Sequence, residues 1–257
     1  MCAWLQKFYL KKKNTKLAQL DELLKAWQTA KPLDVLQLEK MQAYFHTAYT
    51  YESNRIEGST LTLQETHLVI NEGITIGGKS MQEHLEAVNH QQAIHFIKDL
   101  VQDQMRLNSH VLKQIHQLVL KGIQDQHAGK YRSVPVLISG SKHVPPAPYL
   151  LDKLMEDYFL FYEQNLGRLH PVILAAEMHE RLVTIHPFID GNGRTASHGS
   201  RQHADTTSPV YRAHSAPHQP QRLGRCVATP RLGLENPQPH HRGHARCPRQ
   251  AARTQSP

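Results

Sequence analysis

The sequence has few cysteines, and their arrangement argues against two kinds of structural cross-link. Cys2, Cys226 and Cys247 are the only three among 257 residues. They are odd in number and far apart, without the paired spacings of disulfide frameworks or structural zinc sites. We therefore expect a fold that needs neither disulfides nor zinc, in a reducing cytoplasmic compartment.

Long hydrophobic runs are also missing. Hydrophobic residues make up 39% of the chain, less than in a typical globular protein. No run approaches the roughly 18–20 apolar residues that span a bilayer. The first apolar stretch, residues 3–10, precedes the lysines at 11–13, which is the reverse of a secretory signal. The sequence thus predicts no membrane partner and no secretion.

Basic charge is lacking from the main body of the chain. The net charge is +8, but residues 197–257 hold nine arginines against Asp205 and Glu235 and so carry +7 of it. A basic surface for nucleic acid is therefore not expected on residues 1–196. Nucleic-acid binding by the basic tail through counterion release stays an alternative. It is disfavoured because Tyr211 is the tail's single aromatic residue for base stacking.

Residues 1–196 have the apolar spacing of a helical protein. Helical periodicity predicts helices over 16–30, 34–52, 81–101, 109–119, 151–162 and 171–185. The pairs Thr62–Glu65 and Ser80–Glu83 are capping-box signatures, Ser109 is a candidate cap, and Pro171 suits a first helical turn. One segment, YRSVPVLISGSKHVPP at 131–146, predicts a short β-hairpin. The expected fold is mainly α with one hairpin.

The composition changes after Ala196. Residues 197–257 contain eight Pro, seven His and nine Arg, but no Lys, Ile, Phe, Met or Trp. Without apolar periodicity such a segment cannot offset the entropy cost of ordering, so we expect a disordered tail. Two origins stay open, a natural flexible tail or translation outside the proper frame near codon 197. The excess of Arg, Pro, His and Ala favours the second.

The stretch TIHPFIDGNGRTASHGS, residues 184–200, contains residues suited to phosphate chemistry. Gly191 and Gly193 frame a loop between helices, where exposed backbone N–H groups can hold phosphate oxygens. Arg194 can grip a phosphate with two hydrogen bonds, and Asp190 suits Mg²⁺ beside phosphates. His186 can accept a hydroxyl proton near neutral pH. Together these groups describe attack by a hydroxyl on a nucleotide phosphate.

Residues 186–194 resemble the Fic (Fido) family motif HxFx[DE]GNGRxxR at every position but the last. The resemblance extends over about residues 53–196. MQEHLEAVNHQQAI looks like the family's helix ahead of the active site, and GKYRSVPVLISGSKHVPP looks like its target-docking flap. It implies a helical fold and transfer of AMP from ATP to a Ser, Thr or Tyr hydroxyl of a target protein. The implied domains are a helical region at 1–52, an incomplete Fic domain at 53–196 and the tail at 197–257.

The resemblance also implies roles for single residues. His186 is the general base, Asp190 the magnesium ligand, and Phe188 packs beneath the loop. The anion pocket consists of four consecutive residues, Gly191, Asn192, Gly193 and Arg194. The flap, about Ile138 to His143, would align the target backbone as an added strand. Lys142 and His143 would border the nucleotide, or else be ordinary exposed loop residues.

A second motif, SNRIEG at 53–58, fits the family's inhibitory pattern [ST]xxxE[GN]. Ser53 and Glu57 lie four residues apart and so share a helical face. The resemblance implies that Glu57 occupies the arginine that should hold the γ-phosphate of ATP. That arginine, the last of the motif, is Ser197 here. We therefore expect weak activity or poor folding, because the helix after the motif also lacks an apolar stripe.

Other interpretations stay open. The chain is either a catalyst or a non-catalytic scaffold that binds a partner through the same fold. The donor is ATP by the match of the flap and the inhibitory motif, although the family includes members that move other phosphate-containing groups. The sequence does not identify the target protein and leaves a homodimer open.

Overall fold

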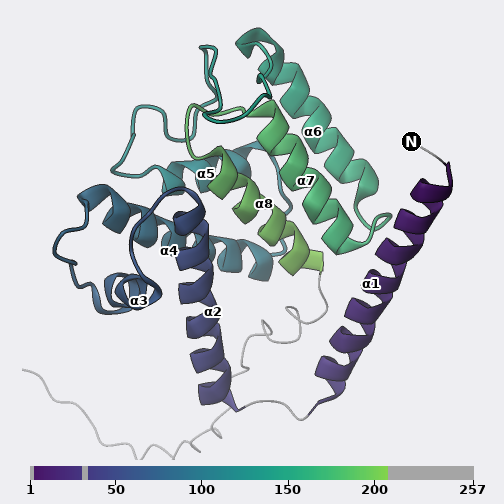
Figure 1. Cartoon of the computed structure of the whole chain (residues 1–257), viewed down its shortest axis with the longest axis horizontal. Coiled ribbons are helices and arrows are strands. Elements are labelled where there is room, and N and C mark those ends of the chain that lie inside the picture. The colour runs from purple at the N-terminus through teal and green to yellow at the C-terminus, as the bar shows by residue number, and fades with distance from the viewer. Residues whose placement is uncertain (1–2, 31–33, 208–257) are drawn as a thin grey trace, which may run out of the picture. The chain divides into compact units, whose positions relative to one another are not determined.

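The computed structural model describes residues 3–30 and 34–207, and every regular element in this part of the chain is a helix (Figure 1). The mainly α fold expected from the sequence is therefore confirmed. In chain order the helices are α1 (Ala3–Thr29), α2 (Val35–Ile56), α3 (Leu63–Glu72), α4 (Met81–Gln102), α5 (Ser109–Val119), the 3₁₀ turn η1 (Pro148–Leu150), α6 (Leu151–Asn165), α7 (Pro171–Ile185) and α8 (Asn192–Thr207).

Local sequence signals explain most helix ends. The capping boxes at Thr62 and Ser80 are both present, because each hydroxyl accepts from the N3 backbone N–H while the N3 glutamate bonds back to the cap. Pro171 occupies the first turn of α7, as expected. The cap predicted at Ser109 is wrong by one residue. Asn108 caps α5 instead, since its Oδ1 accepts from the Val111 N–H at 3.0 Å.

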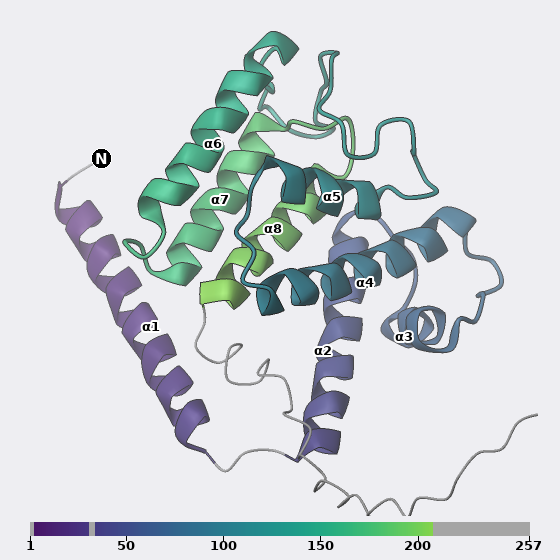
Figure 2. The same ribbon diagram turned by 180° about the vertical axis from the view of Figure 1, so that it is seen from behind.

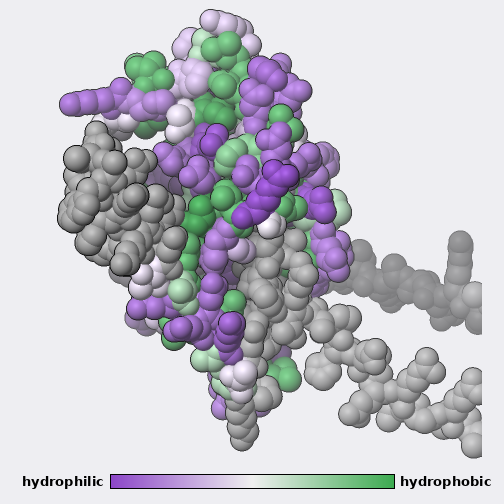
Figure 3. Space-filling view, turned by 90° about the vertical axis from the view of Figure 1, so that its right-hand side faces the viewer, coloured by the Kyte–Doolittle hydropathy of each residue, from purple (hydrophilic) through white to green (hydrophobic). Residues whose placement is uncertain are grey.

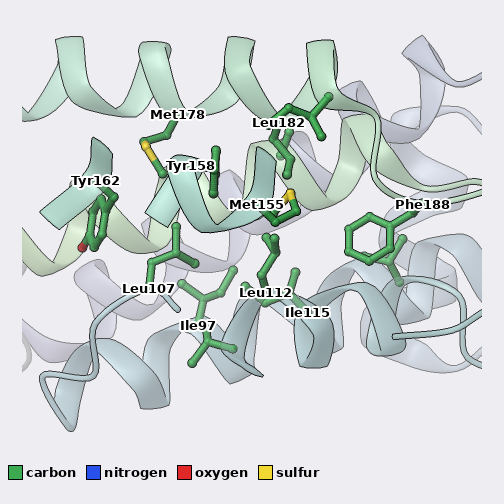
Figure 4. Close-up of a cluster of buried hydrophobic side chains, with 14 of the residues drawn as sticks. Ile97, Leu107, Leu112, Ile115, Met155, Tyr158, Tyr162, Met178, Leu182 and Phe188 are labelled. Carbon is green, nitrogen blue, oxygen red and sulfur yellow. The ribbon is translucent and has the colours of Figure 1, made fainter. Parts of the chain in front are cut away.

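The main hydrophobic core lies between α4, α5, α6, α7 and the loop that follows α7. Figure 4 shows Tyr162 of α6 towards one end of this cluster and Phe188, beyond α7, towards the other. Leu112, Ile115 and Leu182 are among its completely buried members. The core thus extends to the Fic-like motif and gives its loop a rigid support.

Helix α4 packs against α2, α3, α5 and α8, as opposite views show (Figures 1 and 2). Its contact with α2 is largely polar. Thr50 Oγ1 lies 3.0 Å from His90 Nδ1, and the Tyr49 and His90 ring centroids are 4.8 Å apart. The His198 ring of α8 lies 4.4 Å from that of His90. This polar packing fixes the C-terminal end of α2 beside α4 and α8.

The apolar stripe predicted for residues 16–30 is helical but not buried. Leu20, Leu23 and Trp27 are 47%, 68% and 42% exposed. A hydrogen bond of 3.2 Å from His170 Nε2 to Asp21 Oδ1 joins the turn before α7 to α1. Hydrophilic and hydrophobic residues are interspersed over the face shown in Figure 3. No helix among the described residues combines the length and apolarity needed to cross a membrane.

The β-hairpin predicted for residues 131–146 is not present, because no strand pairing occurs in this segment. Residues 131–146 are extended, with one turn in which the Ser141 N–H donates to the Ile138 carbonyl at 3.1 Å, and no strand is assigned there. Pro135, Pro145 and Pro146 explain the difference, because proline has no N–H to donate to a ladder. From here on, the name flap refers to residues 134–146, which include the segment Ile138 to His143 named above.

Helical order does not end at Ala196, so that expectation is wrong. Helix α8 continues to Thr207 and packs along α7 (Figure 1). His198 and Gln202 are completely buried, and Gln202 Nε2 donates to the Met105 carbonyl at 2.7 Å. Helix α8 therefore docks through small and polar residues rather than an apolar stripe. The rest of the predicted disordered tail, from residue 208, lies outside the described residues.

Gly199 offers a test of this helix. A Cβ built on it would lie 3.7 Å from Leu112 Cδ1 and 3.9 Å from Leu107, which is ordinary van der Waals contact. We expect Gly199→Ala to raise the free energy of unfolding by about 0.5–1 kcal/mol, because alanine restricts the unfolded chain and favours helix.

Urea unfolding measures this gain. The matched control is Gly140→Ala in the flap, where φ is +72° and alanine is strained, so stability should fall. A Gly199→Ala protein no more stable than the parent would contradict helical packing at residue 199.

Candidate active site

The candidate site is the loop between α7 and α8, which begins at His186. Its backbone is left-handed there, with φ 52° and ψ 57°, and its N–H closes α7 by donating to the Leu182 carbonyl at 2.8 Å. A residue other than glycine holds this conformation only when surrounding contacts enforce it. The turn directs the chain from α7 into the loop, with the His186 side chain at its start.

The loop is closed by a reciprocal pair of hydrogen bonds. The Phe188 N–H donates to Asn192 Oδ1, and Asn192 Nδ2 donates to the Phe188 carbonyl, each at 2.9 Å. Phe188 is buried beneath the loop, as expected. The side chain expected to bind nucleotide at position 192 is thus already used to shape the loop.

Gly191 and Gly193 are needed for different reasons. Gly191 has φ +69°, and a Cβ there would lie 3.3 Å from Val119. A Cβ on Gly193 would lie only 2.6 Å from Oε1 of Glu57. The first glycine allows the backbone turn, and the second allows a carboxylate to approach the first turn of α8. The N-terminal N–H groups of that helix favour an anion.

Asp190 is fixed by three groups. Its Oδ1 accepts from the Gly191 N–H at 2.6 Å, and its Oδ2 accepts from Gln124 Nε2 at 3.2 Å. Its carbonyl accepts from His116 Nε2 at 3.0 Å. The carboxylate is half-buried and keeps unused lone pairs. This donor set suits Mg²⁺, which is commonly held by one carboxylate together with phosphates and water. Among the described residues no group of three metal-ligating side chains occurs.

His116 supports the loop and was missed by the sequence reasoning. Its ring stacks on Phe188 with centroids 3.7 Å apart and planes 8° apart. The Gly129 N–H donates to Nδ1 at 2.8 Å, so the proton donated to Asp190 resides on Nε2. Burial lowers the pKa of His116 to about 4. In the sequence, His116 follows Ile115 on the apolar face of α5, as many buried structural histidines do. Nothing in the sequence therefore marked it as a support of the loop.

The electrostatics of His186 suit a neutral imidazole. Burial lowers the pKa of His186, and the charges of Arg132 and His143 act in the same direction. Its Nδ1 lies 3.2 Å from the Val183 carbonyl, which can only accept. An N–H on Nδ1 leaves Nε2 unprotonated and able to take a proton.

Arg194 is buried rather than open to solvent. It is 4% exposed, and its Nη1 lies 3.4 Å from Oε1 of Glu86 on α4. Its Nε and Nη1 have no hydrogen-bond partner among the described residues. In this conformation the guanidinium lies in the interface of α4 and α8, and its binding to a phosphate stays a prediction.

Arg132 is a second residue that the sequence reasoning left without a role. It is 3% exposed, and its Nε donates to the His186 carbonyl at 2.8 Å. The two candidate flap residues nearby differ from it. His143 Nε2 donates to the Thr184 carbonyl at 2.9 Å, at the end of α7, whereas Lys142 is exposed.

The inhibitory motif reaches the loop. Ser53 lies in the last turn of α2, and Glu57 is the C-cap residue just beyond it, with its carboxylate against Gly193. No cation of the described residues forms an ion pair with Glu57. Ser197, the position of the motif's last arginine, is half-buried on α8. The next arginine, Arg201, lies over the Tyr49 ring at 5.1 Å.

Comparisons with known sequences agree with this geometry. The Fic/DOC family profile matches residues 106–204. A protein adenylyltransferase Fic of Nematostella vectensis is 40% identical over 159 residues, 60% of this chain and 36% of the relative. The protein of the same name in Drosophila mojavensis is 35% identical over 184 residues, 70% of this chain and 36% of the relative. The chain thus spans about a third of the length of these curated relatives.

Solved structures show the same fold. A Fic domain containing signaling protein from Bacteroides thetaiotaomicron has a TM-score of 0.63 and 29% identity, covering 72% of this chain and 71% of that one. Fic-1 (residues 134–508) from C. elegans has a TM-score of 0.72 and 25% identity, covering 80% of this chain and 61% of that one.

Stability should depend on pH through His116. An unfolded histidine titrates at 6.5 and the folded His116 at about 4, so the unfolded chain binds more protons between these values. The stabilisation is complete above pH 6.5 and is lost as the pH falls towards 4. His116→Gln should reduce the slope of unfolding free energy against pH in this window by up to about 1.4 kcal/mol per pH unit.

Urea unfolding at several pH values measures that slope. Buried His198 and His90, whose pKa values are also lowered by burial, should keep part of it. His110→Gln on the exposed side of the same helix is the control for the loss of an imidazole. An unchanged slope in His116→Gln would show that His116 is protonated alike in both states.

Proposed function

This chain is a member of the Fic/DOC family, and on that premise we propose that it is a protein adenylyltransferase. It would transfer AMP from ATP to a Ser, Thr or Tyr hydroxyl of a target protein. The observation that carries the proposal is the loop closed by Asn192 and Phe188, which joins an imidazole with a free Nε2 to the N-terminal turn of α8. The imidazole can accept a proton, and the N-terminal turn of α8 can bind a negatively charged phosphate.

In the proposed reaction the target hydroxyl oxygen attacks the α-phosphorus of ATP while its proton passes to Nε2 of His186. A bond forms between the hydroxyl oxygen and that phosphorus, and the bond from the phosphorus to the bridging oxygen breaks. Pyrophosphate leaves with the bond electrons. A neutral histidine is needed, and the lowered pKa of His186 supports it at pH 7.

The anion pocket is assigned mainly to the backbone N–H groups of Asn192 and Gly193, with Gly191 forming the turn, because the Gly191 N–H already donates to Asp190. This assignment follows from two contacts, since the side chain of Asn192 is used within the loop and Arg194 pairs with Glu86. Asp190 would hold Mg²⁺, which neutralises phosphate charge when bound. Gln124 and the Gly191 N–H orient that carboxylate.

Glu57 is proposed to inhibit the reaction by occupying this pocket itself. Its carboxylate lies against Gly193, where a phosphate would approach the N-terminus of α8. The inhibition expected from the motif uses an arginine that is Ser197 here. In this chain the negative charge of Glu57 and its position are sufficient to exclude a second anion.

A scaffold without catalysis is the second candidate function. Two observations favour it, the serine at position 197 and the burial of Arg194 against Glu86. Loss of one cation that faces a transferring phosphoryl group costs about 10²–10³ in rate. Partner binding that is insensitive to His186→Ala, without AMP transfer, would distinguish a scaffold from an enzyme.

If His186 is the general base, its removal should lower the rate of AMP transfer but not the affinity for ATP. His186→Ala, made in a Glu57→Gly background, should lower AMP transfer from radiolabelled ATP by about 10²–10⁴, the usual contribution of a general base. The Kd for ATP should change less than about threefold, because the imidazole does not hold the phosphates. His179→Ala, six residues before the end of α7, serves as the control. Undiminished transfer in His186→Ala would reject the assignment.

The inhibitory assignment predicts that Glu57→Gly gains function. ATP affinity should rise at least about tenfold, equivalent to about 1.4 kcal/mol, when the competing carboxylate is removed. Glu52→Gly is the matched control, since Glu52 lies on the same helix but forms an exposed pair with Arg55. Calorimetric titration with ATP measures both. Equal affinities for the two variants would mean that Glu57 does not occupy the pocket.

A further inference from the structure

Arg132 connects three separate parts of the active-site region. Its Nη1 donates to the Val134 carbonyl at 3.2 Å and its Nη2 to the Pro146 carbonyl at 2.7 Å, so it joins both ends of the flap. Its Nε donates to the His186 carbonyl at 2.8 Å. Its backbone N–H donates to the Pro187 carbonyl at 2.9 Å. No carboxylate of the described residues forms an ion pair with it.

The flap has little else to hold its position. It contains no strand ladder, and Leu137 and Val144 are 84% and 70% exposed. Apart from the turn at Ile138, the other tie is the His143 bond to the Thr184 carbonyl. Pro145 is the one buried residue of the flap. A segment without ladder bonds and with so little buried surface is expected to move freely unless side chains fix its ends. The guanidinium fixes both ends at one point.

The same guanidinium supports the strained backbone of His186. A left-handed residue other than glycine costs about 1–3 kcal/mol and persists only where contacts enforce it. The Arg132 guanidinium donates to the His186 carbonyl, and the Arg132 backbone N–H donates to the Pro187 carbonyl. The His186 N–H itself donates to α7, so both polar backbone groups of His186 are bonded. A planar guanidinium can reach several carbonyls at fixed angles, which a lysine cannot.

We infer that Arg132 is a positioning residue that sets the distance and angle between the flap and His186. This inference rests on the proposed function, in which the flap aligns the backbone of the target protein and His186 takes the hydroxyl proton. One side chain then fixes both the element that presents the hydroxyl and the base that receives its proton. In this role Arg132 acts through the flap and through His186, not by direct contact with ATP or the target.

A positioning role for Arg132 affects two reactions at this site to different extents. Transfer to a protein hydroxyl requires a correctly placed flap, whereas hydrolysis of ATP to AMP and pyrophosphate uses water and needs only the anion pocket and His186. Misplacement of reacting groups by about 1 Å can cost about 10² in rate. Loss of Arg132 should therefore impair transfer to protein much more than ATP binding.

The first experiment measures flap position without catalysis. In the full chain, Cys2, Cys226 and Cys247 are changed to Ser, and spin labels are placed at Leu137→Cys in the flap and Glu163→Cys on α6. Both parent side chains are exposed. We expect a narrow distance distribution in this protein, a broad or shifted one in Arg132→Gln, and an intermediate one in Arg132→Lys. Arg168→Gln, an exposed arginine after α6, is the control.

The second experiment uses the Glu57→Gly chain with radiolabelled ATP and Mg²⁺. We expect Arg132→Gln to lower self-labelling of protein hydroxyls at least about thirtyfold and to lower AMP release into water less, because water needs no flap, while ATP affinity changes less than about threefold. Arg132→Lys should restore part of the labelling. Thermal melts identify unfolded variants, and Arg132→Lys, which retains the buried charge, then carries the comparison.

The two readouts fail separately. An unchanged distance distribution in both Arg132 variants overturns the positioning role, whatever the activity. A broadened distribution with equal losses of labelling, ATP binding and hydrolysis also overturns it, because the residue would then only stabilise the fold. If the Glu57→Gly parent transfers no AMP at all, the proposed function fails, and the distance measurement still decides what Arg132 does.

Discussion

The active-site region depends on the pair of hydrogen bonds between Phe188 and Asn192. They close the loop after α7 and determine where α8 begins, since Asn192 is also its first residue. Phe188 anchors the loop in the core through its stack on His116. The N-terminal amides of α8 and the imidazole of His186 therefore have a fixed relation before any ligand binds. Such preorganisation is what an electrostatic site requires.

Much of this arrangement was predictable from the sequence. The capping boxes and Pro171 act locally, so they located helix starts correctly. The motif at 186–194 indicated which residues gather at the loop. Two features depended on distant contacts and were not predictable. Arg132 and His116 act on backbone carbonyls that are close only after folding.

Helix α8 shows a limit of periodicity as a criterion. A helix is normally recognised by an apolar stripe, which residues 197–207 lack, and we expected none there. The neighbouring helices accept small and polar residues instead, because Gly199 lies beside Leu112 and the buried His198 ring lies 4.4 Å from the His90 ring at a tilt of 48°. Such packing leaves both ring nitrogens of His198 without a hydrogen-bond partner among the described residues. Unpaired buried polar groups are costly, so this interface stabilises the fold less than an apolar one.

The low stability of this polar interface matters for the inhibition proposed for Glu57, because Glu57 directly follows α2 and α2 packs on the same polar surface. Tyr49 and Thr50 of α2 contact His90, and His198 lies against both rings. The position of the Glu57 carboxylate at Gly193 is set by the place where α2 ends, since no arginine of residues 34–207 pairs with it. The inhibition proposed for Glu57 would therefore be only as strong as the docking of α2, and a group that displaces this helix would free the proposed phosphate site without touching it. In a protein with an arginine at position 197 the ion pair would act as a second restraint. Here the geometry of one helix end acts alone.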